Sequence, residues 1–338
     1  MLGVDMSKEW FHICVMNAQH KIKEEFQVDN RLDSIDKFIE ELKDRLSLGE
    51  LSEVHLLLEH TGIYVQFLVK SWLSHGGRLS IVAANKISEH LGLRPGKEEK
   101  TDQLDARRIA EYGCRFYDKL EVWQPQAGNL RKLQRLQRQR EQLVQYRSSL
   151  RQPLKASQRF DEPCLAQQLA ANLADTLHSM DEAIQAIEQQ IKRLIDQDSD
   201  LKVLFKRICS VPGIGLITAT ELLIVTNGFR DFAPHQAKSF ARYAGCVPQR
   251  RQSGNKSRQV RASKQANQRI KKLLTIGARS VMRGQSELGQ YYERKRSEGK
   301  SHLMVLNALR NKLIHRVFAV VRNEVMYQKN LNLSLGKP

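Results

Sequence analysis

The first 83 residues alternate short apolar runs with amphipathic ones, and this order restricts the fold more than any other feature. Three strand-like runs come first, followed by helical and strand-like patterns in alternation. The expected strands are Leu2–Asp5, Phe11–Met16, Ile22–Val28, Val54–Leu58 and Leu79–Ala83, and the expected helices lie around Ile35–Leu42 and at Ile63–Trp72. Such an order predicts an α/β layer with a mixed sheet.

Acidic residues stand at the ends of two of these strands. Asp5 follows Leu2–Val4, and Glu59 ends the run Leu56–Leu58. A carboxylate at the end of a buried strand is either satisfied by neighbouring hydrogen bonds or bound to a cation. A ribonuclease-H-like layer is one fold with this order of elements, and both interpretations of the acids stay open for it.

Two further carboxylates, Asp102 and Asp105, open an expected helix for which Thr101 is the expected N-cap. Their spacing puts them on one face of that helix. Acids in a first turn also complement the helix dipole, so this pair alone does not require a ligand. Together with Asp5 and Glu59, however, they supply the hard oxygen ligands that one or two Mg²⁺ ions need for phosphoryl transfer.

The charge of the chain is divided unevenly. The 338 residues carry a net charge of +18, but residues 1–124 hold 17 basic and 21 acidic side chains, a net charge of −4. Residues 125–338 hold 38 basic and 16 acidic side chains, a net charge of +22. This asymmetry predicts a polyanion partner for the second part.

Composition excludes several other classes of protein. Hydrophobic residues make up 41% of the chain, which excludes wholesale disorder. No apolar stretch approaches the ~20 residues of a membrane span and no signal peptide is evident, so we expect a cytoplasmic protein without a membrane partner. The five cysteines are scattered and never spaced C-x-x-C, which favours neither disulfides nor a zinc site.

Long helices are expected between the two differently charged parts. One begins near Gly128 and is expected to end before Pro153, and a heptad seam runs from Leu177 to Leu194. The two helices can pair with each other across a turn at Pro153–Pro163 or with another subunit, and we expect a dimer. The resulting domains are 1–124, a coiled-coil linker at 125–202, and a mostly helical basic domain at 203–330.

The basic domain opens with a glycine-containing turn, Val211–Gly215, that is similar to the hairpin of helix-hairpin-helix proteins. Gly213 and Gly215 would let backbone N–H groups approach a phosphate at a helix N-terminus. A plain turn between two helices explains the same residues equally well.

A run without acids follows this turn. Between Phe232 and Ser286 there are 13 basic residues and no Asp or Glu, which is typical of a surface that contacts a nucleic-acid backbone. The residues expected to bind nucleic acid are Arg250, Arg251, Lys256, Arg258, Arg261, Lys264, Lys271, Lys272, Gly213 and Gly215.

Serines lie within this basic run. A serine among arginines can hydrogen-bond a phosphate or can attack it, with the arginines stabilising the developing charge. Ser253, Ser257 and Ser263 are equally suitable on this basis.

Taken in order, several short motifs resemble one known family, the bridge-RNA-guided recombinases of bacterial insertion sequences, which are similar to the Piv and MooV invertases. The resemblance spans nearly the whole chain. It rests on Gly3–Lys8, Glu59–Tyr64, Lys100–Ala106, Pro212–Gly215, Tyr243–Pro248, Ser253–Gly254 and Ser263–Asn267. Ala266 departs from the family pattern, which often has glycine at this position, and the lead before Asp5 is very short.

This resemblance implies a mechanism and a set of partners. It implies a RuvC-like domain whose Asp-Glu-Asp-Asp set is Asp5, Glu59, Asp102 and Asp105, with Mg²⁺ as cofactor. It further implies that Ser253 attacks DNA and forms a covalent 5′-phosphoserine intermediate. A structured bridge RNA would pair with donor and target DNA, and the protein would act as a homo-oligomer, a dimer or tetramer.

Two other functions fit the residues. A RuvC-like, metal-dependent and structure-specific endonuclease would hydrolyse DNA with the carboxylates, and its basic domain would only bind. A non-catalytic nucleic-acid-binding protein would use its acids for structure alone. Whether the carboxylates cut DNA or support Ser253 also stays open.

Overall fold

The computed structural model describes residues 1–59, 62–91, 101–124, 128–247, 252–253, 256–257, 266–283 and 286–328, with 252, 253, 256 and 257 as backbone positions. The chain forms two compact units, Met1–Pro125 and Gln126–Pro338. Within the described ranges, no helix combines the length and the apolar character needed to cross a membrane.

The first unit contains a five-stranded mixed sheet in the order β3-β2-β1-β4-β5. Strands β1 to β3 are antiparallel neighbours, whereas β4 runs parallel to both β1 and β5. The strands are β1 (Leu2–Met6), β2 (Trp10–Met16), β3 (Ile22–Asp29), β4 (His55–Glu59) and β5 (Arg78–Val82). The predicted strands and the mixed α/β layer are therefore confirmed.

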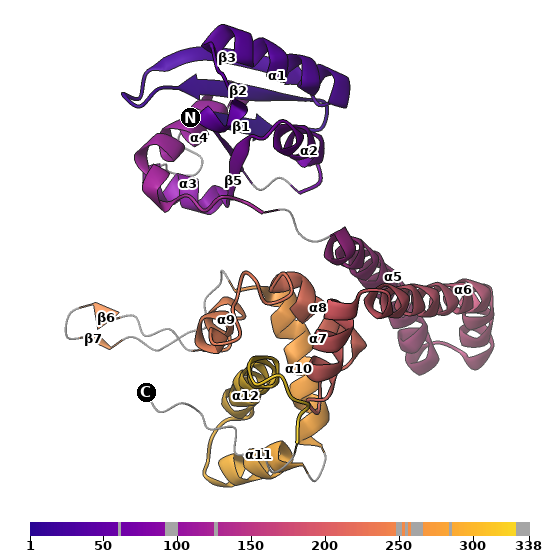
Figure 1. The fold of residues 1–338 in the computed structure, drawn as a ribbon. Coiled ribbons are helices and arrows are strands. Elements are labelled where there is room, and N and C mark those ends of the chain that lie inside the picture. Colours follow the sequence, from indigo (N-terminus) through magenta and orange to yellow (C-terminus); the bar gives the residue numbers. More distant parts are fainter. Residues whose placement is uncertain are drawn as a thin grey trace. The chain divides into compact units, whose positions relative to one another are not determined.

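Helices cover both faces of this sheet (Figure 1). Side chains of α1 (Leu32–Leu46) and α2 (Gln66–Ser74) pack on one face, with Trp72 fully buried. Helices α3 (Ala84–Leu91) and α4 (Asp102–Arg115) pack on the other, and short 3-10 turns lie at η1 (Leu51–Glu53) and η2 (Tyr117–Lys119). Helix α2 begins three residues later than expected, because residues 63–65 form a turn, and α3 was not predicted.

Two long helices, α5 (Gly128–Phe160) and α6 (Pro163–Asp196), form a hairpin within the chain. Arg140 Nε lies 2.6 Å from Glu188 Oε1, and Arg151 joins Asp181 nearer the turn, as the antiparallel arrangement requires. The expected end before Pro153 is wrong, since α5 continues through this proline. An interior proline costs about 3 kcal/mol, but the packing against α6 outweighs one lost hydrogen bond.

The heptad seam of α6 is the buried side of this hairpin at its inner end. Ile184, Ile187 and Ile191 are buried and join a core that includes Leu130 and Leu133 of α5. The same core continues into the C-terminal helices, so the hairpin and these helices share one hydrophobic interior. Of the two pairings considered, the structure contains the one within the chain.

The remaining helices of the second unit surround that interior (Figure 1). They are α7 (Ser199–Cys209), α8 (Leu216–Val225), α9 (Ala237–Tyr243), α10 (Gln268–Met282), α11 (Glu287–Ser297) and α12 (His302–Arg322), and a small hairpin is formed by β6 (Gln252–Ser253) and β7 (Lys256–Ser257). The predicted mostly helical C-terminal region is thus confirmed.

Candidate functional site

The first candidate site lies at one end of the sheet, where Asp5 and Glu59 occupy corresponding positions in β1 and β4. These strands are parallel neighbours with Val4 opposite Leu58, and each acid is the next residue of its strand. Corresponding residues of adjacent parallel strands project to the same face. Asp5 and Glu59 are both partly exposed, and each takes part in at least one polar or electrostatic interaction.

Helix α4 approaches the same end of the sheet with its first turn. Gly3 of β1 lies against the backbone of Ala106 and Ala110, so closely that a Cβ at Gly3 would overlap the helix. Met1 lies against Gly113 of the same helix, so α4 runs antiparallel to β1. The residues before Ala106 are therefore directed towards the Asp5 end of the strand.

The start of α4 is capped as predicted. Thr101 Oγ1 accepts a hydrogen bond from the Leu104 N–H at 3.3 Å. Asp102 is exposed, whereas Asp105 is partly buried and its Oδ1 lies 3.0 Å from Arg108 NH1. In the part of the chain that the structure describes, no three His, Cys, Asp or Glu side chains are grouped closely enough to hold a metal ion.

One ion pair that the sequence did not reveal holds α4 on the sheet. Arg107 donates through Nε and NH2 to the two carboxylate oxygens of Glu25 in β3, each at 2.6 Å, and Gln103 adds a third hydrogen bond. The hydrogen bond from Arg107 holds the pKa of Glu25 below its ordinary value. This bidentate contact fixes the rotation of α4, and with it the direction of Asp102 and Asp105.

The second candidate site surrounds the serine segment in the second unit. Tyr243 and Asn267 flank residues 248–265 and contact each other. The Asn267 backbone N–H donates to the Tyr243 carbonyl at 3.0 Å. The Asn267 amide Nδ2 also donates to Tyr243 Oη at 2.8 Å. Gly245, at φ +64°, packs directly on the Ala266 methyl group. The described residues on either side of the serine segment are therefore held together.

Ser253 itself stands in a strand of the small hairpin. Its backbone pairs with Lys256, and Gln252 pairs with Ser257. The side chains of Ser253 and Lys256 lie outside the described part of the chain. So do five of the predicted nucleic-acid-binding residues, which are Arg250, Arg251, Arg258, Arg261 and Lys264.

Two predicted nucleic-acid-binding residues, Lys271 and Lys272, lie in the second turn of α10, partly buried and exposed respectively. Asn267 is the N-cap of this helix, and its Oδ1 accepts hydrogen bonds from the Arg269 and Ile270 N–H groups at 3.1 Å. The same asparagine thus fixes both the start of α10 and the end of the serine segment.

The two glycines of the predicted hairpin have different surroundings. Gly213, at φ +88°, lies against α10, and a Cβ there would come within 2.8 Å of the Gly277 carbonyl oxygen. Gly215 is the exposed N-cap of α8, and a Cβ there would have no neighbour within 4 Å. Gly213 is thus required for packing, whereas Gly215 has open space beside it at the start of α8.

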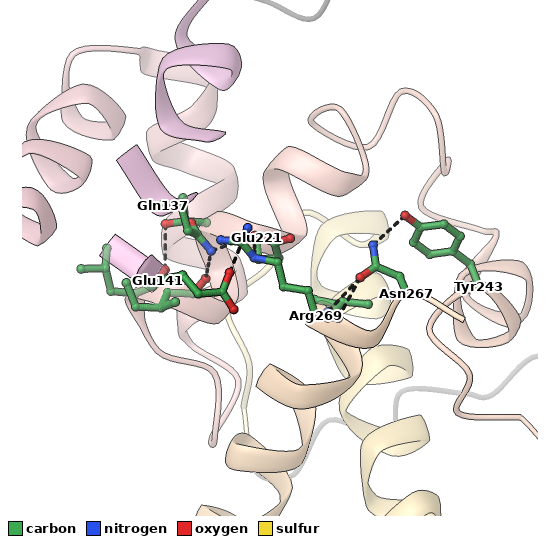
Figure 2. A network of polar contacts seen from close by, with 10 residues as sticks. Gln137, Glu141, Glu221, Tyr243, Asn267 and Arg269 are labelled. Atoms are coloured by element: carbon green, nitrogen blue, oxygen red, sulfur yellow. Dashed lines mark hydrogen bonds and ion pairs between the residues drawn. The ribbon is translucent and has the colours of Figure 1, made fainter. Parts of the chain in front are cut away.

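A buried polar network connects α5, α8 and α10 (Figure 2). Gln137 Nε2 donates to Glu221 Oε2 at 2.9 Å, and Arg269 Nε lies 3.0 Å from the same oxygen. Arg269 also reaches Glu141 Oε2 at 3.2 Å. Burial raises the pKa of Glu221, although Arg269 opposes this shift. The sequence signal for this network was a single acid inside the apolar run Leu216–Val225.

Comparisons with known proteins agree across both units. Residues 2–157 match a DEDD transposase model for IS110, and residues 205–293 match the Transposase IS116/IS110/IS902 family. The chain belongs to this family of transposases. The first match contains Asp5, Glu59, Asp102 and Asp105, and the second contains Ser253.

Relatives of this transposase differ in how much of its length they cover. A pilin gene-inverting protein of Moraxella lacunata is 28% identical over 337 residues, with 98% of both chains covered. The transposase for insertion sequence element IS1111A of Coxiella burnetii is 22% identical, with 84% of this chain and 78% of the relative covered. An uncharacterized 42 kDa protein of insertion element IS900 from Mycobacterium paratuberculosis is 30% identical over 168 residues, with 48% of this chain and 40% of the relative covered.

Proposed function

We propose that this transposase exchanges DNA strands through a covalent intermediate on Ser253. The observation that carries the proposal is the ordered family match, which places a carboxylate-bearing unit and a basic serine segment in one chain. The contacts between Tyr243 and Asn267 support it, because they hold together the described residues on either side of that segment.

The chemical step is a transesterification. Ser253 Oγ attacks a DNA phosphorus, a phosphoserine ester forms, and the bond from phosphorus to the 3′ oxygen breaks. The serine proton is transferred to the departing 3′ oxygen, directly or through a base. Because bond energy is kept in the phosphoserine, another 3′ hydroxyl can reverse the step and rejoin exchanged strands. Cations beside the serine would stabilise the charge that develops on the phosphate.

We further propose that Asp5 and Glu59, with Asp102 and Asp105, bind Mg²⁺. The chemistry of this donor set suits the ion, and the first turn of α4 is directed towards the Asp5 end of the sheet. The described side chains are not yet grouped for coordination, and Asp105 is paired with Arg108. Metal binding would therefore require Asp105 to exchange its arginine partner for the cation. When bound, Mg²⁺ would polarise a phosphate oxygen or activate a nucleophile.

Guidance by a bridge RNA and assembly into a dimer or tetramer complete the proposal. The basic residues of the second unit suit a structured RNA as well as DNA, because both present a phosphate backbone. Assembly is supported by exposed apolar side chains on the α5–α6 hairpin, Phe160 and Leu165 near its turn and Tyr146 further along α5. A second copy of the chain would cover them.

A denaturing gel tests the central step. Purified protein with its co-purifying RNA, Mg²⁺ and end-labelled DNA from the element ends should give a label shifted by the mass of the protein. Ser253→Ala should lose this band, whereas Ser257→Ala, on the opposite strand of the same hairpin, should keep it. An adduct that persists in Ser253→Ala refutes the assignment of the nucleophile.

The carboxylates are tested on the same gel. Asp5→Ala should lose the band if the metal site supports the serine. Free cut ends without any adduct, in the unaltered protein, would instead indicate the metal-dependent endonuclease, whose basic domain only binds. Unchanged DNA together with tight binding would indicate the non-catalytic alternative.

A further inference from the structure

Two cationic side chains, Arg310 and Lys271, lie where the described chain enters the serine segment, and the exposed Arg279 acts electrostatically on one of them. Arg310 of α12 and Lys271 of α10 both act electrostatically on the Cys246 thiol, and Arg279 of α10 acts on Arg310. Lys271 is close to the backbone here, since its Nζ would lie 3.7 Å from a Cβ at Gly245. The cluster therefore belongs to the base of residues 248–265.

The guanidinium of Arg310 is incompletely satisfied by the chain. Its NH1 donates to Asn307 Oδ1 at 3.2 Å, and Asn307 Nδ2 donates in turn to the Cys246 carbonyl at 2.8 Å. Its Nε is buried and has no hydrogen-bond partner among the described residues. A guanidinium has five N–H donors, so most of its hydrogen-bonding capacity is unused here.

Among the residues that the structure describes, no carboxylate balances this charge. Within the described ranges, no ion pair joins Arg310, Lys271 or Arg279 to an acid, and residues 233–286 contain no Asp or Glu that could supply one. Other arginines of the same helices differ in this respect. Arg269 of α10 pairs with Glu221 and Glu141, and Arg316 of α12 pairs with Glu287.

The surroundings of Arg310 in the folded chain therefore disfavour the positive charge of its guanidinium. Burial, and secondarily Arg279, lower the pKa of Arg310. A partly buried charge such as that of Arg310, with like charges near it and no counter-ion, is costly, and an anion would relieve the cost. Because arginine binds phosphate oxygens through a planar fork of N–H groups, a phosphate is the anion that this arrangement suits.

We propose that Arg310 and Lys271 bind a backbone phosphate of the DNA substrate beside the serine segment, and that Arg279 adds to the positive potential there. The proposal rests on the function proposed above and names groups that hold DNA beside the residues carrying Ser253. DNA is favoured over RNA because the segment bounded by this cluster contains the proposed nucleophile. Lys271 was expected from the sequence to bind nucleic acid, whereas Arg310 lies outside the acid-free run and was not.

Binding of a fluorescent DNA duplex to the full-length protein tests this, by anisotropy over a series of salt concentrations. Arg310→Gln should lower the affinity about tenfold or more, and should reduce the slope of log K against log salt by about 0.9, one phosphate contact. Arg310→Lys should recover part of both. The matched control is Arg322→Gln, an exposed arginine about 18 Å further along α12, which should behave as the unaltered protein.

Thermal unfolding without DNA separates binding from folding. A cation that serves only structure should lower the Tm when it is removed, whereas a cation kept for an external anion should leave the Tm unchanged or raise it at low salt. Unchanged affinity and slope in Arg310→Gln overturn the proposal, as does a lowered Tm that accounts for the lost binding.

Two further measurements keep this result distinct from the serine chemistry. If Arg310→Gln weakens the binding of a structured RNA but not the binding of DNA, the DNA site is refuted. If the unaltered protein makes no covalent adduct but its DNA binding depends on Arg310, the phosphate site stands and the serine mechanism fails. If the adduct forms in full and binding is unaffected by Arg310→Gln, the mechanism stands and the phosphate site fails.

Discussion

Arg269 Nε lies 3.0 Å from Glu221 Oε2, so a guanidinium in the first turn of α10 meets a carboxylate inside the apolar helix α8 (Figure 2). Gln137 of α5 donates to the same carboxylate oxygen. One buried acid therefore joins the long hairpin to the helix that follows the serine segment. Asn267, two residues before Arg269, carries this connection on to Tyr243.

Replacing Glu221 in two ways should separate the burial cost of its charge from its hydrogen bonds. Glu221→Ala leaves Gln137 and Arg269 without their shared acceptor, and should cost roughly 1–3 kcal/mol of unfolding free energy. Glu221→Gln keeps an acceptor and removes the charge whose burial raises the pKa, and should cost less. Urea unfolding of both variants checks this, and an equal loss in the two would show that the charge itself is needed.

The pH dependence has a definite sign. Because the pKa of Glu221 is raised on folding, its contribution favours the folded state at acid pH and is lost as pH rises from the ordinary value of 4.5 through the folded pKa. Glu221→Gln should remove this part of the pH dependence. A profile that is unchanged in the variant would assign the dependence to other groups.

Local patterns in the sequence identified the fold of the first unit well. The order of strands and helices along the chain followed from apolar runs and their alternation, and Thr101 was identified as a cap because its hydroxyl precedes a helical pattern. Asp198 is likewise a cap formed by chain neighbours, since its Oδ1 accepts from the Leu201 N–H at the start of α7 at 3.1 Å. Such features depend on neighbours in the chain, which sequence displays directly.

Features that depend on distant residues were not visible in this way. The continuation of α5 through Pro153 depends on packing against α6. The proposed phosphate site depends on α12, which brings Arg310 close to α10. The role of Gly213 depends on Gly277, 64 positions later in α10. The four carboxylates were proposed from spacing and resemblance, and their Mg²⁺ chemistry stays a prediction.

Gly245 and Ala266 are in contact, and swapping the glycine and the alanine between the two positions tests this contact. Gly245→Ala should destabilise the second unit, because φ +64° costs about 1–2 kcal/mol for a residue with a Cβ and the new methyl would overlap that of Ala266. Adding Ala266→Gly should remove the overlap and recover part of the loss. Thermal unfolding of the single and double variants measures the recovery, and strictly additive losses would contradict the contact.

Alanine substitutions at Gly213 and Gly215 should have different effects on stability and on DNA binding. Gly213→Ala forces a methyl group against Gly277 and Val281 at a positive φ, so it should lower the Tm. Gly215→Ala has open space and an extended backbone, so it should leave the Tm within about 2 °C. If the N-terminus of α8 contacts a DNA phosphate, Gly215→Ala should still weaken DNA binding, and measured affinity equal to the unaltered protein would exclude that role.

His55 predicts an acid sensitivity of the first unit. Its Nε2 lies 2.9 Å from Ser80 Oγ, and the Ser80 hydroxyl donates to the Glu121 carbonyl at 2.6 Å, so the histidine donates to Ser80. Burial, and then Arg78, lower the pKa of His55 below its ordinary value of 6.5. Because the unfolded chain then binds the proton more tightly, stability should fall as pH drops from 6.5 through the folded pKa. His55→Gln keeps a donor for Ser80 and does not titrate, so its Tm should depend less on pH between about 5 and 7. Parallel slopes for the two proteins in that interval would show that another group controls the acid sensitivity.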